Sequence, residues 1–564
     1  MGYTEGEFDY IVVGGGTAGC VLAARLSEDA SVRVLLIEAG PEDRNLWIHL
    51  PIGFAKMTNS PYEWGFRTQP IRAGENRVIP LAQGKVLGGG GSINAQVFTR
   101  GTPGDYDGWA RDFGAIGWTF DEIQPYFIRS EGNERLSGPW HGTDGPLGVS
   151  DIHEVNPLTR AWVKAGMEFG LPFTGDFNGE TQYGVGYYQT TTRRGRRCST
   201  SVAYLKPVRK RRNLQVQVGH HVNRIVLKGR RATGVEVAAG GTTHHWRARR
   251  EVILAAGSIG SPTLLQRSGI GDPNDLREAG VEVLHELPGV GKNLQDHCDL
   301  DIVYELRRYM SMDRLTRMYR PYSIAVGLQY LLSRSGPLAS TLVEGGAFSF
   351  GNPDEPTPDL QFHFLPAAGV EAGIAKLPVG YGCTLNSYFL HPRSRGSVRI
   401  ASADPARPPL IDPNYIADPY DLRMSAEGLR QMREIMAQRS MARLVKRELL
   451  VGDRPLRTEE DHVRYVREHG RTSYHPAGTC AMGTGPDAVV SPELDVHGLE
   501  GLRVVDCSIM PRIVSSNTQA ATVMIAEKGS DLIFGRSAPA SFVRPSSRQA
   551  TGPRPVAASG VVGP

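Results

Sequence analysis

Hydrophobic runs separated by glycine mark the first elements of the chain. An apolar run covers residues 8–13, a glycine-rich turn spans 14–19, and a helical pattern follows directly. Continuous apolar runs of this length are typical of parallel strands that are buried on both faces. A second run, VRVLLIEAG at 32–40, predicts another strand, which ends at Glu38. The order strand, glycine turn, helix, strand predicts a Rossmann-like α/β domain.

The glycine turn carries the spacing of a dinucleotide-binding fingerprint. Gly14, Gly16 and Gly19 form G-x-G-x-x-G between the predicted strand and helix. The first glycine permits the turn, the second lets the backbone approach a pyrophosphate, and the third lets the helix pack on the strand. Glu38 lies where a carboxylate can bind ribose hydroxyls. The fingerprint alone leaves open FAD, NAD or a glycine turn without a ligand.

Length and charge narrow the class of protein. The chain has 564 residues, 40% of them apolar and 22% charged, which is the composition of a soluble protein with two domains. The net charge of +4 is small for this length. The run that comes closest to a nucleic-acid-binding stripe is KPVRKRRN at 206–213, and it is interpreted as a solvated turn. We therefore expect no nucleic-acid partner.

Cysteine spacing and the N-terminus bear on location. The six cysteines are scattered without a C-x-x-C pair, which argues against a zinc site or a disulfide framework and for a reducing compartment. The first residues do not form a signal peptide, and no apolar run reaches the length of a membrane span. We expect a cytoplasmic protein without a metal or a transmembrane segment, and peripheral contact with a membrane stays open.

A second glycine cluster suggests what the dinucleotide is. The stretch GKVLGGGGSINAQVFTRGTPGDYDGW begins at Gly84, and its bare backbone suits a flat, rigid ligand. This stretch resembles the first signature of the glucose-methanol-choline (GMC) flavoprotein oxidoreductases, and GSIGSPTLLQRSGIG at 257–271 resembles the second. LPGVGKNLQDH at 287–297 and HPRSRGSVRI at 391–400 continue the likeness, as do YHPAGTCAMG and the segment GLRVVDCSIMPRIVSSNTQAATVMIAEKGSDLI.

The resemblance implies an α/β fold in which a Rossmann-like FAD-binding domain is joined to a substrate domain built on an antiparallel sheet flanked by helices. The FAD domain is expected over 8–305, completed by 475–535. The substrate domain is expected over 306–474, with 155–200 packing beside it. Residues 536–564 are rich in Pro, Ser, Gly and Ala, which predicts a disordered tail.

The resemblance also implies the residues that bind FAD. Some relatives link FAD covalently through a histidine before the asparagine of the glycine loop, but Ile93 precedes Asn94 here, so we expect noncovalent FAD. Val222 and Asp506 match family positions near the adenine and the flavin, although strand core and turn are equally good explanations for them. The expected cofactor-binding residues are Gly14, Gly16, Thr17, Ala18, Gly19, Glu38, Ala39, Gly88, Gly91, Ser92, Asn94, Ala95, Val97, Val222, Ala256, Gly257, Asp506, Thr518 and Gln519.

The candidate catalytic pair is His475 and Asn517. His475 precedes Pro476, so it lies on a loop or a strand end rather than inside a helix. The resemblance places it over the flavin beside Asn517, with His297 as a structural histidine. A neutral imidazole with a pKa near the working pH is well matched to accept an alcohol proton, and an amide can hold the same oxygen. The alternative is a structural histidine with Asn517 as a helix cap.

These residues favour a GMC-type alcohol dehydrogenase or oxidase. The predicted reaction converts an alcohol, expected to be a primary one, into its aldehyde by proton abstraction and hydride transfer to flavin N5. The sequence does not identify the alcohol or the electron acceptor, which can be oxygen, a quinone or another compound. Aromatic residues such as Phe348 and Phe362 are more often core than pocket. A non-redox flavoprotein of the same fold, a lyase or photodecarboxylase, is the alternative.

Overall fold

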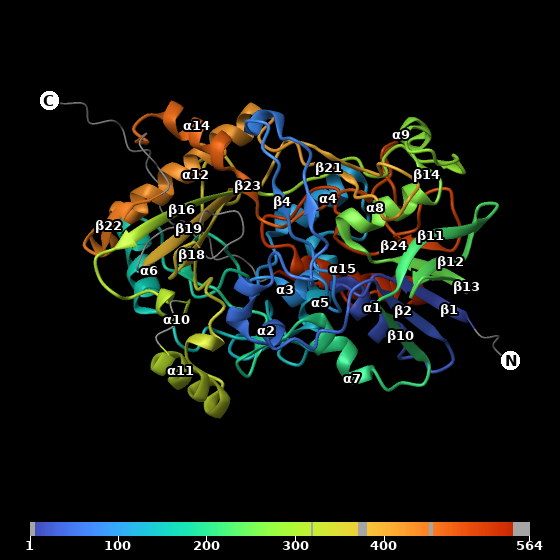
Figure 1. Ribbon diagram of the computed structural model, residues 1–564, viewed down its shortest axis with the longest axis horizontal. Helices are drawn as coiled ribbons and strands as arrows, with labels where there is room; N and C mark the ends of the chain where they lie inside the picture. Colours follow the sequence, from blue (N-terminus) through green and yellow to red (C-terminus); the bar gives the residue numbers. More distant parts are fainter. Residues whose placement is uncertain (1–5, 317–319, 370–380, 450–454, 545–564) are drawn as a thin grey trace.

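Two β-sheets with their covering helices form the molecule. The computed structural model describes residues 6–316, 320–369, 381–449 and 455–544. In Figure 1 the first sheet lies on the right, near the N-terminus, and the second lies on the left. The expected fold class is confirmed, because the first sheet is mainly parallel and the second is antiparallel throughout its described pairings.

The first sheet carries the dinucleotide-binding pattern. The run at the N-terminus forms β1, which is almost fully buried and pairs in parallel with its neighbours on both sides. The strand order is β10 (Leu214–Val218), β2 (Val34–Glu38), β1 (Glu7–Val13), β13 (Thr242–Leu254), β12 (Arg231–Ala239) and β11 (His221–Lys228), with β24 (Leu502–Val504) beside β13. Helices α1 (Thr17–Leu26) and α8 (Gly257–Arg267) pack on it, α15 (Gln519–Phe534) packs on α1, and α5 (Phe120–Ser130) packs on α15.

The second sheet has one apolar face and one face with polar side chains. Its order is β22 (Val445–Glu448), β16 (Cys298–Leu306), β19 (Gly382–Phe389), β18 (Leu360–Leu365), β17 (Gly345–Ser349) and β7 (Gly184–Tyr187), with β23 (Arg471–Thr472) beside β16. Helices cover the apolar face: α6 (Pro157–Phe169), α12 (Pro419–Ala437), α13 (Arg439–Ala442) and α14 (Glu459–His469). Phe362 belongs to this helix-covered core and Phe348 to the smaller core on the cavity side, so both are core residues as expected.

The sheet pairings shift one expected domain boundary. Residues 298–305 form most of β16, so they belong to the second sheet and not to the FAD domain that was expected to extend to 305. The alternating pattern of CDLDIVYEL continues to Leu306, so the expected boundary at 305 falls inside this strand. The excursion at 155–200 does contribute α6 and β7 to the second layer.

The start of the expected disordered tail is ordered, which corrects the prediction for residues 536–544. The Phe542 ring lies 5.2 Å from that of Trp140, and its backbone N–H donates to the carbonyl of Asp121 at 2.7 Å. Arg544 forms ion pairs with Asp107 and Asp121. An aromatic and a charged anchor in a polar segment account for this packing, while the remainder of the predicted tail, 545–564, lies outside the described residues.

Candidate active site

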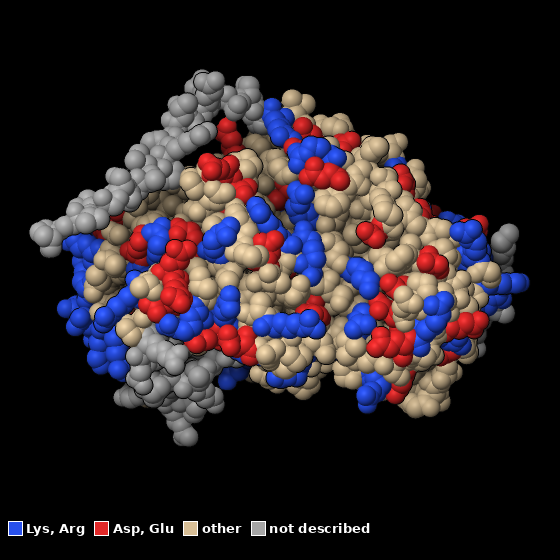
Figure 2. All heavy atoms as spheres, turned by 90° about the horizontal axis from the view of Figure 1, so that it is seen from above, with Lys and Arg blue, Asp and Glu red and all other residues tan. Residues whose placement is uncertain are grey.

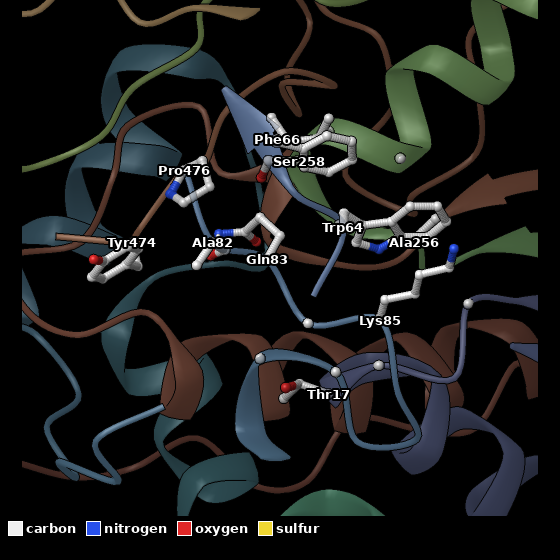
Figure 3. Close-up of a pocket in the computed structure, with 18 of the residues that line it drawn as sticks. Thr17, Trp64, Phe66, Ala82, Gln83, Lys85, Ala256, Ser258, Tyr474 and Pro476 are labelled. Atoms are coloured by element: carbon white, nitrogen blue, oxygen red, sulfur yellow. Dashed lines mark hydrogen bonds between the residues drawn. The ribbon is translucent and has the colours of Figure 1, made fainter. Parts of the chain in front are cut away.

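A cavity of about 790 Å³ runs from the glycine turn after β1 to the polar face of the second sheet. Figure 3 shows part of its wall, with Trp64 and Phe66 on the opposite side of the hollow from Thr17. At one end lie the edge of the first sheet and the start of α1. At the other end lie His475, Asn517 and the second sheet. An elongated ligand can therefore reach from the nucleotide fingerprint to the candidate catalytic pair.

The first glycine turn forms an anion-binding end of this cavity. Gly14 has φ +103°, and a Cβ there would lie 2.5 Å from the carbonyl oxygen of Ala255. A Cβ at Gly19 would lie 1.8 Å from the Gly14 oxygen, so this glycine permits the helix to pack on the strand. The first turn of α1 has no side-chain cap and no acidic residue, and Thr17 and Ala18 line the cavity. Its free amides suit a phosphate.

Glu38 presents an oriented carboxylate to the same end. Its Oε2 accepts from the Gly15 N–H at 2.8 Å and its Oε1 from the Gly40 N–H at 2.7 Å. Burial raises the pKa of the Glu38 carboxyl, and these two amides oppose that rise. Glu38 and Ala39 both line the cavity, in the position expected for a group that accepts hydrogen bonds from ribose hydroxyls.

The second glycine cluster packs directly on the first. The Gly88 N–H donates to the Gly15 carbonyl at 2.8 Å, and a Cβ at Gly89 would lie 2.7 Å from the Cα of Gly16. Ser92 is fully buried, and its hydroxyl donates to the Leu87 carbonyl at 2.6 Å. Of the expected cofactor contacts, Gly19, Gly88 and Ser92 therefore lie behind the cavity wall and shape the turn.

The wall beside the glycines offers a hydrogen-bond donor without a protein partner. Asn94 donates to the Oε1 of Gln519, and Arg197 donates to the Oδ1 of Asn94 at 2.8 Å. The Nε2 of Gln519 is buried and has no hydrogen-bond partner among the described residues. A Cβ at Gly91 would lie 3.0 Å from that Nε2. Because a buried donor normally has a partner, this arrangement fits a flat cofactor edge with acceptor atoms.

The other expected cofactor residues reach the cavity as well. Asp506 accepts from the Gly257 N–H at 2.9 Å and from the Ser261 hydroxyl at 2.6 Å, so this acid also fixes the start of α8. Burial raises the pKa of Asp506. The start of α15 has no side-chain cap and no acid in its first turn. The remaining expected residues that line the cavity are Ala95, Val97, Val222, Ala256 and Thr518.

Sequence reasoning missed an aromatic and basic wall near Val222. The Trp64 and Phe66 rings stack at 5.7 Å, and the ammonium of Lys85 lies 4.6 Å from the centre of the Trp64 ring. His221 meets the Trp64 ring edge-on at 5.9 Å. Trp64 and Phe66 belong to β3 (Phe66–Arg67) and its flank, while Lys85 follows β4 (Pro80–Leu81) and His221 begins β11. A strand of two residues is too short to give a hydrophobic period that could have predicted this wall.

His475 is held by a tight turn anchored on one buried acid. Asp296 accepts from the His475 backbone N–H at 2.9 Å and from the Thr472 hydroxyl at 2.6 Å. Tyr474, between them, takes a left-handed backbone with φ +65°. Burial raises the pKa of Asp296 to about 6. These contacts fix the backbone of His475 and thereby the position of its ring in the cavity wall.

The structure brings His475 and Asn517 together, as expected. The His475 Nε2 lies 3.1 Å from the Asn517 Nδ2. The Oδ1 of Asn517 accepts from the Thr99 hydroxyl and from the Gln361 amide, each at 3.0 Å. With its oxygen engaged by two donors, the Asn517 amide directs its N–H at the imidazole.

The contacts of His297 settle which imidazole nitrogen is free of a proton. The His297 Nε2 lies 3.2 Å from the carbonyl of Leu390, which only accepts, so this nitrogen carries the hydrogen. Its Nδ1, bare in the neutral ring, lies 3.1 Å from the His475 Nδ1, which must then be the donor. The Ser473 hydroxyl, 2.9 Å away, also contacts that nitrogen. The His475 Nε2 is consequently the unprotonated one, and it accepts from Asn517.

Burial corrects one expectation for His475. The pKa of its imidazole is lowered to about 3, first because burial disfavours the charged ring and then because of His363 nearby. The pKa of His297 is also lowered well below its usual value by burial. The expected pKa near the working pH is therefore wrong for this site, and the imidazole is neutral throughout the neutral range.

Polar residues of the second sheet complete the cavity, and they were missed although the sequence carries a signal for them. In LQFHFL the residues Leu360, Phe362 and Phe364 face the helices, so Gln361 and His363 point to the other side. His363 lines the cavity together with Asp299, Asn386 and Tyr388. The alternation of apolar and polar residues in β16, β18 and β19 predicts such a face.

Two acidic side chains of this sheet share one cation. Asp299 lies 3.0 Å from a guanidinium nitrogen of Arg471, which also pairs with Asp301. All three side chains are buried. The wall of the cavity at this end therefore carries a carboxylate that is already in an ion pair.

Comparison with known proteins identifies the family. The GMC oxidoreductase N-terminal model matches residues 8–299 and the C-terminal model matches 392–526. The chain is 42% identical over 533 residues to an alcohol dehydrogenase [acceptor] of Pseudomonas putida, covering 93% of this chain and 95% of that protein. It is 41% identical over 537 residues to the oxygen-dependent choline dehydrogenase of Paraburkholderia xenovorans, covering 94% and 95%.

Solved structures agree in fold and cofactor. Pyridoxine 4-oxidase from Mesorbium loti superimposes with a TM-score of 0.85 at 32% identity, covering 94% of this chain and 100% of that one. An FAD-dependent oxidoreductase from Chaetomium thermophilum superimposes with a TM-score of 0.86 at 30% identity, covering 94% and 99%. The expected FAD cofactor is confirmed by these relatives, and the glycine cradle fits it. The chain belongs to the GMC oxidoreductase family of FAD-dependent enzymes.

Proposed function

We propose that this protein oxidises an uncharged primary alcohol to its aldehyde, with His475 as the base that takes the hydroxyl proton. The observation that carries the proposal is the unprotonated His475 Nε2, which lies in the cavity 3.1 Å from an amide donor of Asn517. A neutral imidazole and an amide at this separation suit one alcohol oxygen between them. FAD, when bound, supplies the acceptor for the carbinol hydride.

The two side chains act on the hydroxyl in different ways. The alcohol oxygen accepts from the Asn517 Nδ2 while its own hydrogen is donated to the His475 Nε2. Thr99 and Gln361 keep the amide in this orientation. The hydroxyl proton passes to the His475 Nε2 as the carbinol loses its hydride. As the ring gains charge, its donation from Nδ1 to His297 strengthens.

The ion-paired carboxylate supports an uncharged substrate. Choline carries a quaternary ammonium group, which is best held by a carboxylate or by an aromatic cage. Asp299 lines the cavity, but the Arg471 guanidinium is its partner at 3.0 Å. A cationic alcohol would have to compete with that buried pair, whereas an uncharged alcohol leaves it intact.

An anaerobic alcohol screen tests this function. Uncharged primary alcohols should bleach the flavin absorption of the holoenzyme, and choline should do so far more slowly. An enzyme bleached by choline alone would contradict the substrate class, and an enzyme bleached by no alcohol would contradict the reaction. Mixing the reduced enzyme with oxygen and with a quinone then identifies the electron acceptor.

We also propose a reducing compartment, such as the cytoplasm. All six cysteines carry unpaired thiols; Cys480 is fully buried, and Cys507 is half-buried and lines the cavity. Proteins of oxidising compartments more often pair their cysteines. Among the described helices, none is both long and apolar enough to cross a bilayer.

A further inference from the structure

One helix of the substrate layer turns an apolar stripe to the outside. On α11 (Arg320–Ser333), Ile324, Leu328, Leu331 and Leu332 are 62%, 53%, 68% and 86% exposed. They stand at i, i+4, i+7 and i+8, so they share one face about 12 Å long at the helical rise. The side chain of Tyr330, on the opposite face, is buried. Clustered exposed leucines, unlike single ones, indicate a contact surface.

Basic side chains lie at the C-terminal end of α11, on a hairpin that contacts its buried face and just after the helix. The Tyr330 hydroxyl donates to the carbonyl of Gly195 at 3.0 Å, which joins α11 to the hairpin of β8 (Thr192–Arg193) and β9 (Arg196–Arg197). Arg194 and Arg196 project from this hairpin and are exposed. Arg334, just after α11, is exposed as well. The apolar stripe thus has cations at its C-terminal end.

The same face continues through α2 to the basic run at 206–213. The Arg197 guanidinium donates to the carbonyl of Ile48 at 2.7 Å, next to the exposed Trp47 of α2 (Leu46–His49). Glu42, shortly before α2, pairs at 2.6 Å with Arg209, which follows α7 (Lys206–Val208). Figure 1 shows α11, α2 and α7 along the lower edge of the molecule.

The charge of this face is positive. Among the described ion pairs, none joins a carboxylate to the exposed cations of the face, which are Arg194, Arg196, Lys206, Lys210 and Arg212. Of the nearby acids, Glu42 is paired with Arg209, Glu154 accepts from Gln329 of α11 at 3.3 Å, and Asp43 lies beside His49 of α2. The run read from the sequence as a solvated turn therefore extends a surface that also carries exposed leucines.

We propose that this basic apolar face, formed by α11, α2, the β8–β9 turn and residues 206–212, docks on an anionic lipid bilayer. Apolar side chains on an interfacial helix enter the boundary of the acyl chains, and flanking Lys and Arg side chains meet the phosphates. A second copy of the chain is a poorer occupant, because a two-fold contact would place the same cations against each other.

Docking here would bring the bilayer close to the cavity. The helical turn η4 (Pro337–Ala339) follows α11 and packs on η1 (Pro51–Lys56). Phe54 of η1 lines the cavity and belongs to one apolar cluster with Val343. The contacts from α11 through η4 to η1 therefore connect the proposed lipid contact to the cavity wall.

Vesicle sedimentation of the FAD-loaded full chain tests the proposal. The enzyme should sediment with vesicles of phosphatidylcholine and phosphatidylglycerol at 3:1, weakly with phosphatidylcholine alone, and less in high salt. L331S/L332S should weaken partitioning roughly 100-fold through lost apolar insertion. K210E/R212E should weaken partitioning to the vesicles by about 25-fold or more.

A matched control lies on the opposite edge. Figure 1 shows α9 (Pro273–Glu278) near the upper edge, and its Arg277 is exposed. Leu284, in the segment that follows α9, is 56% exposed. R277E/L284S should partition like the wild type, and all variants should keep their melting temperature and their turnover with a soluble acceptor. Absent vesicle binding, or binding that neither face variant alters, would overturn the proposal. Light scattering that shows a dimer lost in L331S/L332S, without vesicle binding, would assign the face to self-association instead.

Discussion

Replacing His297 tests whether its contact with His475 decides which nitrogen of the His475 ring carries the hydrogen. His297 is fully buried, and its Nδ1 is the acceptor for the His475 Nδ1–H at 3.1 Å. His297→Leu removes that acceptor and leaves only the Ser473 hydroxyl near the nitrogen. The hydrogen can then move to Nε2, where it blocks the proposed base.

The size of the effect follows from one buried hydrogen bond. Leaving a buried donor without its partner costs about 1–3 kcal/mol, so the competent form should fall by roughly 5–150-fold. The rate constant of flavin reduction by alcohol should fall by the same factor, because only that form accepts the proton. Stopped-flow absorbance under anaerobic conditions measures it directly.

An isosteric variant separates this role from packing. His297→Asn offers an amide oxygen near the position of the lost Nδ1 and has nearly the shape of leucine, so it should reduce flavin close to the wild-type rate. Both variants should be checked for FAD content and melting temperature. Equal losses in the Asn and Leu variants would mean that His297 acts only through packing, and a Leu variant with the wild-type rate would refute the reasoning altogether.

Three further results are expected. The rate of flavin reduction should be independent of pH from about 5 upward, because burial lowers the pKa of His475 to about 3. The base is lost only when the pH falls toward that value. A rate that rises between pH 6 and 8 in stopped-flow experiments would contradict this expectation. FAD should be released into the supernatant on acid precipitation, since Ile93 offers no nucleophile before Asn94, and a yellow pellet would count against noncovalent binding. Truncation after residue 544 should leave the melting temperature unchanged. Truncation after residue 535 should lower it, because Phe542 packs on Trp140 and Arg544 pairs with Asp107. Equal melting temperatures of the two truncated proteins would show that these contacts add no stability.

The nucleotide end of the site could be predicted from local sequence. Gly14 and Gly19 must be glycine because neighbouring backbone occupies the space of a side chain, and the G-x-G-x-x-G spacing predicts such constraints without a structure. The position of Glu38 in the site could be predicted because this residue ends a buried strand. The position of His475 off a helix follows from Pro476, although the sequence does not show which groups bury it.

The rest of the site depends on contacts between distant segments. His297 and His475 are brought together by the pairing of the strands that adjoin them. No local sequence pattern shows which nitrogen of each ring carries the hydrogen. The low pKa of His475 comes from burial, which follows from the whole fold. Trp64 lies beside a strand of two residues, too short for a periodic pattern. The alternation in LQFHFL did carry a signal for His363, because polar residues at every second position mark one face of a sheet.

Flavin reduction by His475→Ala tests the central claim most directly. If the His475 Nε2 accepts the alcohol proton, the variant should retain FAD and its melting temperature while the reductive rate constant falls by roughly 10²–10⁴-fold. Asn517→Ala should lose less, because this amide orients the hydroxyl without taking its proton. An FAD-loaded His475→Ala enzyme reduced at the wild-type rate would contradict the account and leave His475 as a structural loop histidine.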